Sequence, residues 1–265
     1  MDFQLQGKRA LVTGSTAGIG FAIARALAAE GASVIVNGRT EARTQAAVAA
    51  IRDSGLPEAN LRGVAADLGS AEGCAKLVAS APDIDVLVNN VGIFEAKPFG
   101  DITDAEWLHF FEVNVLSGVR LSRAYLPSML ARNWGRILFI SSESALQIPV
   151  EMIQYGMTKT AQLAVARGLA EMTAGSAVTV NSILPGPTKS EGVTDFVSGL
   201  AAQQGKSVTD VERDFFLHAR PTSLLKRFET PEEIAAVTVF VASPRSSGIN
   251  GAALRVDGGV VRAVG

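Results

Sequence analysis

Short apolar runs alternate with helix-forming stretches along the whole chain, and this alternation constrains its fold more than any other feature. Alternating strands and helices predict βαβ units, and therefore an α/β fold: one doubly wound parallel sheet with right-handed crossovers and helices on both faces. A composition of 48% hydrophobic and 19% charged residues suits such a sheet, because its strands are buried on both faces. The predicted strands are residues 9–12, 33–37, 61–65, 86–89, 136–140, 178–183 and 253–256. The predicted helices are residues 19–30, 41–53, 72–79, 105–132, 155–173 and 231–242.

The chain is predicted to form a single domain over residues 1–265, because it contains no internal repeat, linker or low-complexity segment. One segment, residues 187–227, separates the sixth predicted strand from the last predicted helix. A structureless loop of that length is uncommon in a compact domain unless it is functional. Its apolar residues, among them Val197, Leu200, Phe215 and Phe216, recur at helix-like spacings. We therefore expect short helices that form a lid.

Charge and cysteine content argue against several classes of protein. The formal net charge is −2 and no basic cluster is present, so we expect no nucleic-acid partner. No apolar run reaches the ~20 residues that span a bilayer, and the first residues lack the pattern of a secretory signal, so no membrane partner is expected. Cys74 is the single cysteine, which excludes an intrachain disulfide and favours a cytoplasmic location. His109 and His218 have no companion cysteines, so no metal site is expected.

A glycine-rich turn follows the first predicted strand and opens the first predicted helix. Residues 13–20 read T-G-S-T-A-G-I-G. Glycines permit a tight turn and let backbone N–H groups approach a phosphate, and the helix N-terminus adds a favourable dipole. The spacing G-x-x-x-G-x-G differs from the commoner G-x-G-x-x-G, and a plain turn is the alternative. The strand–turn–helix context favours dinucleotide binding.

The end of the second predicted strand bears on the choice of cofactor. An acid at this point would bind the ribose hydroxyls of NAD. The sequence instead has Asn37-Gly38-Arg39, with no carboxylate before Glu41. Arginine can hold a 2′-phosphate through a bidentate, charge-assisted contact, so NADP is favoured and NAD is possible. The alternative is that Arg39 is a solvated loop charge.

Tyr155 and Lys159 are the candidate proton-transfer groups. Residues four apart on a helix project from one face, so the phenol and the ammonium are expected to be neighbours. A free phenol has a pKa near 10, and a nearby ammonium can lower it by roughly 1–3 units. The pair could therefore exchange a proton with a substrate oxygen near neutral pH.

With these motifs together, the chain resembles the short-chain dehydrogenase/reductase family, in its single-domain branch, over nearly its whole length. Residues 13–20 match T-G-x-x-x-G-x-G, residues 89–92 match N-N-A-G with Val91 in place of alanine, and Ser142 precedes Tyr155 by thirteen residues. The resemblance implies a Rossmann-like fold and a cofactor site formed by Gly14, Ser15, Thr16, Gly18, Ile19, Gly20, Asn37, Arg39, Asp67, Leu68, Asn90, Gly92, Tyr155, Lys159, Pro185, Gly186 and Thr188.

The resemblance also implies catalytic roles for four residues. Tyr155 would protonate the oxygen of a ketone while a hydride reaches its carbon. Lys159 would hold the nicotinamide ribose and lower the phenol pKa. Ser142 would hydrogen-bond the substrate oxygen. Asn114, within the long predicted helix, would anchor a water that connects Lys159 to solvent.

Several of these residues have plain structural alternatives. Ser142 could cap a turn. Asn114 could be a buried amide with satisfied hydrogen bonds, and Asn89 and Asn90 could be turn residues alone. Asp67 could be the N-cap of the following helix.

The predicted activity is interconversion of an alcohol and a ketone, with NADP as cofactor and a small carbonyl or alcohol substrate. A 3-oxoacyl-carrier-protein reductase is the specific alternative, and a relative with a non-redox outcome or a nucleotide sensor without turnover are the others. Ala161, Ala164 and Gly168 form a strip of small residues on the helix that carries Tyr155. This strip predicts a helix or subunit interface, in a homo-oligomer that is a tetramer or a dimer.

Overall fold

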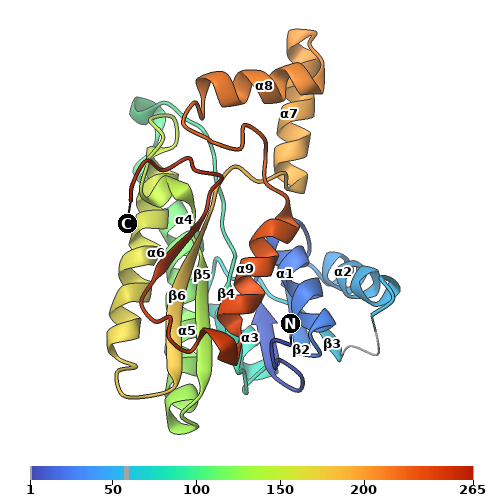
Figure 1. The fold of residues 1–265 in the computed structure, drawn as a ribbon, viewed down its shortest axis with the longest axis vertical. Helices are drawn as coiled ribbons and strands as arrows, with labels where there is room; N and C mark the ends of the chain where they lie inside the picture. Colours follow the sequence, from blue (N-terminus) through green and yellow to red (C-terminus); the bar gives the residue numbers. More distant parts are fainter. Residues whose placement is uncertain (1, 57–59, 265) are drawn as a thin grey trace.

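Seven of the apolar runs pair into one parallel sheet in the computed structural model, which describes residues 2–56 and 60–264 (Figure 1). The strand order is β3-β2-β1-β4-β5-β6-β7, and every neighbouring pair is parallel. The predicted doubly wound sheet is therefore confirmed. The strands are β1 (Arg9–Val12), β2 (Ser33–Gly38), β3 (Leu61–Ala65), β4 (Val86–Asn89), β5 (Gly135–Ile140), β6 (Val178–Pro185) and β7 (Ala253–Val256).

Helices cover both faces of the sheet, and each layer has its own buried apolar cluster. On one face α1 (Gly18–Ala29), α2 (Glu41–Asp53) and α9 (Pro231–Ala242) pack on the strands through residues such as Ile23 and Val239. On the other face α3 (Ala71–Ser80), α5 (Ser117–Ala131) and α6 (Ile153–Glu171) do so through residues such as Leu77 and Leu121. Because both faces are covered, the strands β4, β5 and β6 are buried at every residue rather than at alternate ones.

The strand order reverses between β1 and β4, which makes this the switch point of the sheet. In open α/β sheets, ligands bind outside the carboxyl ends of the strands at such a point. The glycine turn follows β1, Asn90 follows β4, Ser142 comes two residues after β5, and Gly186 follows β6. The fold therefore gathers the candidate residues at one edge.

The long helix expected over residues 105–132 is interrupted, so that prediction was wrong in detail. Residues Asp104–Phe111 form α4, Glu112–Leu116 form a π-helical turn, and Ser117–Ala131 form α5. Ser117 N donates to Glu112 O, five residues back, so the turn holds one extra residue. Asn114 lies at the centre of this turn.

The segment after β6 contains two helices, as expected for residues 187–227: α7 (Glu191–Gln204) and α8 (Val208–His218). Figure 1 shows both projecting past the end of the sheet. They enclose a small core of their own, which contains Val197, Phe216 and Phe228, and the rings of Phe215 and Phe228 stack at 5.0 Å. The phenylalanines of the lid therefore pack largely against one another. Among all helices in the described residues, none is long and apolar enough to cross a membrane.

Candidate active site

The turn between β1 and α1 exposes backbone to a ligand. Gly14 and Gly18 have φ angles of 59° and 55°, in the left-handed region that favours glycine. A Cβ at Gly20 would lie 2.4 Å from Asn90 Nδ2 and 2.5 Å from Gly14 O, so a larger residue does not fit. α1 starts after Ala17 with no side-chain cap and no acid in its first turn. Its first N–H groups and its dipole can therefore meet a phosphate, which fits the dinucleotide that the sequence implies.

Three of the expected cofactor residues hold this turn in shape. Asn37 Oδ1 accepts from Gly14 N at 3.2 Å, and its Nδ2 donates to two carbonyls at the end of β3. Asn90 Nδ2 donates to Thr13 O and Gly14 O at 2.9 and 3.1 Å. Ser15 is fully buried, and its Oγ donates to the end of β1 at 2.7 Å. These three side chains therefore form their hydrogen bonds within the protein.

Arg39 stands exposed immediately after β2. Its neighbour Gly38 packs against the glycine turn, where a Cβ would lie 2.4 Å from Thr16 Cγ2. Ile19 is partly buried and packs against the apolar cluster of its face. The structure thus brings the end of β2 against the glycine turn and leaves the guanidinium of Arg39 facing solvent.

Asp67 and Leu68 lie after β3, at the same edge of the sheet. Leu68 is buried, whereas Asp67 is exposed and its Oδ1 accepts from Gly69 N at 3.0 Å. The N-cap of α3 is Ser70, whose side chain accepts from Gly73 N. The alternative that Asp67 caps α3 is therefore wrong.

Ser142 and Tyr155 meet beyond the end of β5. Ser142 is buried and opens a short 3₁₀ turn (Glu143–Ala145), where its Oγ accepts from Ser144 N at 3.1 Å. The turn-capping alternative is thus confirmed, and it coexists with a hydrogen bond between Ser142 and the phenol of Tyr155. Tyr155 is half-buried in the first turn of α6, with the edge of the Phe94 ring against it at 6.3 Å. The geometry places the phenol and the serine hydroxyl together.

Lys159 lies one turn further along α6, and it is buried. Its Nζ donates to Ile140 O at 2.9 Å and lies 5.5 Å from the centroid of the Tyr155 ring. Burial lowers the pKa of Lys159 to about 8. Burial also raises the pKa of Tyr155, and the hydrogen bond with Ser142 opposes only part of that rise. The expectation that Lys159 lowers the phenol pKa was therefore wrong, because burial outweighs every charge around the ring.

Asn114 faces Lys159 across Gly92. A Cβ at Gly92 would lie 3.4 Å from Lys159 Nζ and 3.5 Å from Asn114 Oδ1. Asn114 Oδ1 accepts from Ile93 N at 2.7 Å, and its Nδ2 donates to Ile93 O at 2.9 Å. Its backbone carbonyl accepts from Gln162 Nε2 at 2.6 Å. The side chain is therefore a buried amide with its hydrogen bonds satisfied. That Asn114 anchors a water stays a prediction, and this water would bind the backbone carbonyl of Asn114.

The segment after β6 is held by a buried glutamate that the sequence did not point to. Gly186 N donates to the backbone of β7 and to Glu229 Oε2 at 3.0 Å, and Thr188 Oγ1 donates to Gly186 O at 2.9 Å. A Cβ at Gly186 would lie 2.8 Å from Asp257 Cα. Burial raises the pKa of Glu229 to about 7. Pro185, Gly186 and Thr188 thus form one braced segment at the site edge.

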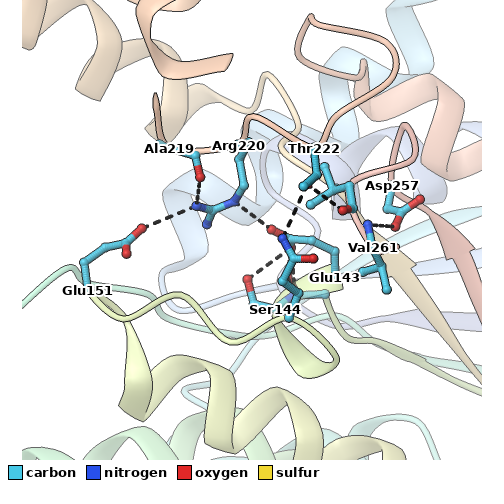
Figure 2. Close-up of polar contacts among 12 residues, drawn as sticks. Glu143, Ser144, Glu151, Ala219, Arg220, Thr222, Asp257 and Val261 are labelled. Carbon is cyan, nitrogen blue, oxygen red and sulfur yellow. Dashed lines mark hydrogen bonds and ion pairs between the residues drawn. The ribbon is translucent and has the colours of Figure 1, made fainter. Parts of the chain in front are cut away.

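A second unexpected group lies directly after Ser142 (Figure 2). Glu143 is buried, and its Oε2 accepts from Ser142 Oγ at 2.5 Å and from Ser144 N at 2.8 Å. Its Oε1 accepts from Arg220 Nε at 3.1 Å, and Arg220 also contacts Glu151 at 3.4 Å. Arg220 comes two residues after α8, so it ties the lid segment to the loop that carries Ser142.

The fold and the site together are those of an oxidoreductase that uses a dinucleotide cofactor. A family model described as enoyl-(acyl carrier protein) reductase matches residues 14–261. The chain is 50% identical over 264 residues to an uncharacterised oxidoreductase of Bacillus subtilis, with 100% of both chains covered. It is 34% identical over 261 residues to the D-beta-hydroxybutyrate dehydrogenase of Cupriavidus necator, covering 97% of this chain and 99% of that one.

Among solved structures, the chain is similar to L-sorbose reductase from Gluconobacter frateurii, complexed with NADPH and L-sorbose. The TM-score is 0.93 at 30% sequence identity, and 100% of both chains is covered. The protein is thus an NAD(P)-dependent oxidoreductase, and it belongs to the short-chain dehydrogenase/reductase family. The resemblance found in the sequence is confirmed.

Proposed function

We propose that this protein uses NADPH to interconvert a small ketone and the corresponding alcohol, with Tyr155 as the general acid and base. The observation that carries the proposal is the hydrogen-bonded pair of Ser142 and Tyr155 at the carboxyl edge of the sheet, with Lys159 buried one turn away. A phenol that lies beside a serine hydroxyl at a dinucleotide site can exchange a proton with a substrate oxygen.

The cofactor would lie along the carboxyl edge, from the glycine turn to the segment after β6. The left-handed glycines and the uncapped start of α1 suit its pyrophosphate. The exposed Arg39 suits a 2′-phosphate, and the similar L-sorbose reductase, solved in complex with NADPH, supports NADP over NAD. Asp67 and Leu68 would contact the adenine, and residues 185–188 would hold the nicotinamide amide.

The nicotinamide, when bound, supplies or accepts the hydride. Tyr155 holds the proton that the substrate oxygen receives in reduction. Because burial raises the phenol pKa, Tyr155 carries its proton at neutral pH and can donate it to a ketone oxygen. Lys159, with a pKa of about 8, carries its proton at neutral pH and can bind the nicotinamide ribose. Ser142 hydrogen-bonds Tyr155 and contacts the substrate, while the carbonyl of Asn114 would hold the water that links Lys159 to solvent.

A 3-oxoacyl-carrier-protein substrate is the specific alternative, and an acidic carrier would need free cations near the site. Arg120 is paired with Glu112 at 2.5 Å, and Arg132 lies 3.6–3.8 Å from Asp83 and Asp85, so these two arginines are partly neutralised. Arg123 of α5 is exposed and forms no ion pair among the described residues. Arg123 is therefore the cation of this helix that such a carrier could contact.

Purified protein incubated with NADPH and a panel of small ketones tests the proposal. We expect ketone-dependent loss of absorbance at the wavelength of reduced nicotinamide, with NADPH preferred to NADH. Tight binding of NADPH without consumption would instead support the nucleotide-sensing alternative. Consumption only with an acyl-carrier-protein thioester would support the carrier-protein alternative.

Assembly forms a separate part of the proposal. Ala164 and Gly168 are exposed on α6 and Ala161 is partly so, and a Cβ at Gly168 would meet nothing within 4 Å. A smooth exposed strip of this kind allows a second helix to approach closely. We propose that it is a symmetric interface in a homodimer or homotetramer.

A further inference from the structure

Phe94 lies beside the reacting phenol and is only half covered by the protein. Its ring meets the ring of Tyr155 edge to face, with the two centroids 6.3 Å apart, and the residue is 54% exposed. Apolar surface of this kind gains free energy when another apolar group removes it from water. A substrate whose carbonyl oxygen reaches Tyr155 therefore has this apolar surface next to its substituents.

Two loops frame the start of α6 and hold Phe94 there. Lys97 N donates to Glu151 O at 2.9 Å, and Gln154 Nε2 donates to Glu95 O at 2.9 Å. The segment after β4, which carries Phe94, is therefore fastened both to the loop before α6 and to the first turn of that helix. Phe94 is thus positioned by the same helical turn that positions the phenol.

Other exposed apolar side chains lie in the second of these loops. Leu146 and Ile148, between the turn that Ser142 opens and the start of α6, are each 47% exposed. Ile148 packs against the first turn of α6, where a Cβ on Gly156 would lie 2.7 Å from Ile148 Cγ2. Single exposed apolar residues are ordinary, whereas several of them beside a reacting group are typical of a binding site. Both loops that frame the start of α6 therefore present apolar side chains.

The lid also approaches Phe94. A Cβ on Gly192, in the first turn of α7, would lie 4.0 Å from Phe94 Cζ. The ring of Phe94 therefore extends from the phenol of Tyr155 to the lid. A substituent that lies along this ring is bounded by the lid as well.

The charged groups beyond the turn that Ser142 opens are matched within the protein. Glu143 accepts from Arg220 Nε at 3.1 Å, and Glu151 lies 3.4 Å from Arg220 Nη1 (Figure 2). Two carboxylates against one guanidinium leave no net positive charge there for an anionic substrate. An uncharged substrate with an apolar substituent therefore fits these surroundings better than one with a carboxylate or a phosphate.

We infer that Phe94 is a specificity-determining residue, which together with Leu146 and Ile148 makes the site selective for ketones that carry an alkyl arm. The inference rests on the proposed function, because it names the substrate class of the same site. The alkyl arm lies against the ring of Phe94 while the carbonyl oxygen meets Tyr155.

A series of 2-ketones that differ only in the length of the arm tests this inference. The series 2-butanone, 2-pentanone, 2-hexanone and 2-octanone keeps the same reacting group, so intrinsic reactivity is nearly constant. Their reduction by NADPH adds a hydride at C2 and a proton at the carbonyl oxygen, which gives the 2-alkanol and NADP⁺. Complete burial of one methylene is worth about fourfold in kcat/KM. In wild type we expect kcat/KM to rise about two- to fourfold per methylene, or about 4- to 16-fold from 2-butanone to 2-hexanone.

Substitutions of Phe94 isolate the contribution of its apolar surface. In Phe94→Ala the rise should fall to about 1.5-fold per methylene or less, while 2-butanone, whose arm is short, keeps kcat/KM within about threefold of wild type. Phe94→Leu retains an apolar side chain and should retain most of the rise. The matched control is Phe99→Ala, because Phe99 lies in the same segment, is 64% exposed and packs on Trp107 instead of Tyr155. This control should show the same rise as wild type.

A second readout does not depend on turnover. Butanamide, pentanamide and heptanamide match 2-pentanone, 2-hexanone and 2-octanone with an amino group in place of the methyl group, and they are not reduced. Their dissociation constants from the complex of enzyme and NADPH should fall by a similar factor per methylene in wild type and by less in Phe94→Ala. The dissociation constant of NADPH itself should be the same in both proteins.

A series that is flat in wild type, or a rise that is equal in wild type and Phe94→Ala, would overturn the inference and leave the proposed function standing. A Phe94→Ala variant that binds NADPH more weakly and keeps the wild-type rise would show that the ring covers the cofactor instead, which also overturns the inference. If no ketone consumes NADPH, the proposed function is wrong, and the carboxamide series alone decides whether Phe94 binds an alkyl arm.

Discussion

Replacing Glu229 by glutamine should make stability less dependent on pH. Glu229 is 3% exposed, and its pKa is raised from 4.5 to about 7 by burial, with the negative charges of Asp257, Glu233 and Glu143 adding to the rise. The unfolded side chain ionises near its ordinary value, whereas the folded one resists ionisation. The contribution of Glu229 to stability is therefore complete below pH 4.5 and is lost as the pH rises through about 7.

The pKa difference sets the size of the effect. A rise from 4.5 to about 7 corresponds to about 3 kcal/mol of unfolding free energy lost above pH 7. Glutamine keeps an oxygen that can accept from Gly186 N, and it does not ionise. Glu229→Gln should match wild type at pH 4.5 and exceed it by up to about 3 kcal/mol at pH 8. For a chain of this size that is a rise in Tm of about 5–10 °C.

Thermal and urea unfolding followed by circular dichroism from pH 4.5 to pH 8, at one protein concentration, would measure this difference. Glu232→Gln is the control, because Glu232 lies exposed in the first turn of α9, three residues along the chain, and pairs with Arg25 at the surface. It should change the unfolding free energy by less than about 1 kcal/mol. A difference between wild type and Glu229→Gln that is the same at pH 4.5 and pH 8 would refute the reasoning.

Four further substitutions have defined outcomes. Gly20→Ala should lower the unfolding free energy by about 1–3 kcal/mol, because its Cβ would overpack against Gly14 O. Gly199→Ala, on an open face of α7, should raise the unfolding free energy by about 0.5–1 kcal/mol. Scanning fluorimetry would measure both shifts, and equal shifts would contradict the turn geometry. Arg39→Leu should lower the preference for NADPH over NADH, measured as kcat/KM, by about 10- to 150-fold, and an unchanged ratio would make Arg39 a plain surface charge. Gly168→Phe should reduce the oligomer in sedimentation velocity, and a wild-type protein that sediments as a monomer at micromolar concentration would contradict the proposed interface.

Periodicity predicted the elements that position the site. Strands and helices fell within a few residues of their expected bounds because the pattern of apolar residues determines which face each segment buries. Once the strands are parallel, their carboxyl ends share one edge, so the turns that hold Gly14, Asn90 and Ser142 had to converge. The spacing of Tyr155 and Lys159 on one helix followed in the same way.

The features that the sequence did not reveal depend on tertiary contacts. The π-helical turn at Asn114 adds one residue to a helix whose pattern is otherwise continuous. Arg220 and Glu143 are 77 residues apart, and nothing local relates them, although an acid next to Ser142 was a visible signal. The direction of the Tyr155 pKa is set by burial, which is a property of the folded state.

The space beside Gly38, at the cofactor site, is likewise a property of the folded state that the sequence does not show. An acid in place of Gly38, at the point where NAD's ribose would be bound, does not fit. A Cβ on Gly38 would lie 2.4 Å from Thr16 Cγ2 and 2.7 Å from Thr44 Oγ1. Any change of cofactor preference should therefore start at Arg39, whose side chain is exposed.

The central claim is that the phenol of Tyr155 supplies the proton in ketone reduction. Its most direct test is the turnover of Tyr155→Phe with NADPH and the best ketone of the panel, together with the dissociation constant of NADPH. The phenol oxygen alone is removed, so NADPH affinity should stay within about twofold of wild type while kcat falls about 10²–10⁴-fold. A phenylalanine variant that retains more than a tenth of the wild-type kcat would contradict the claim.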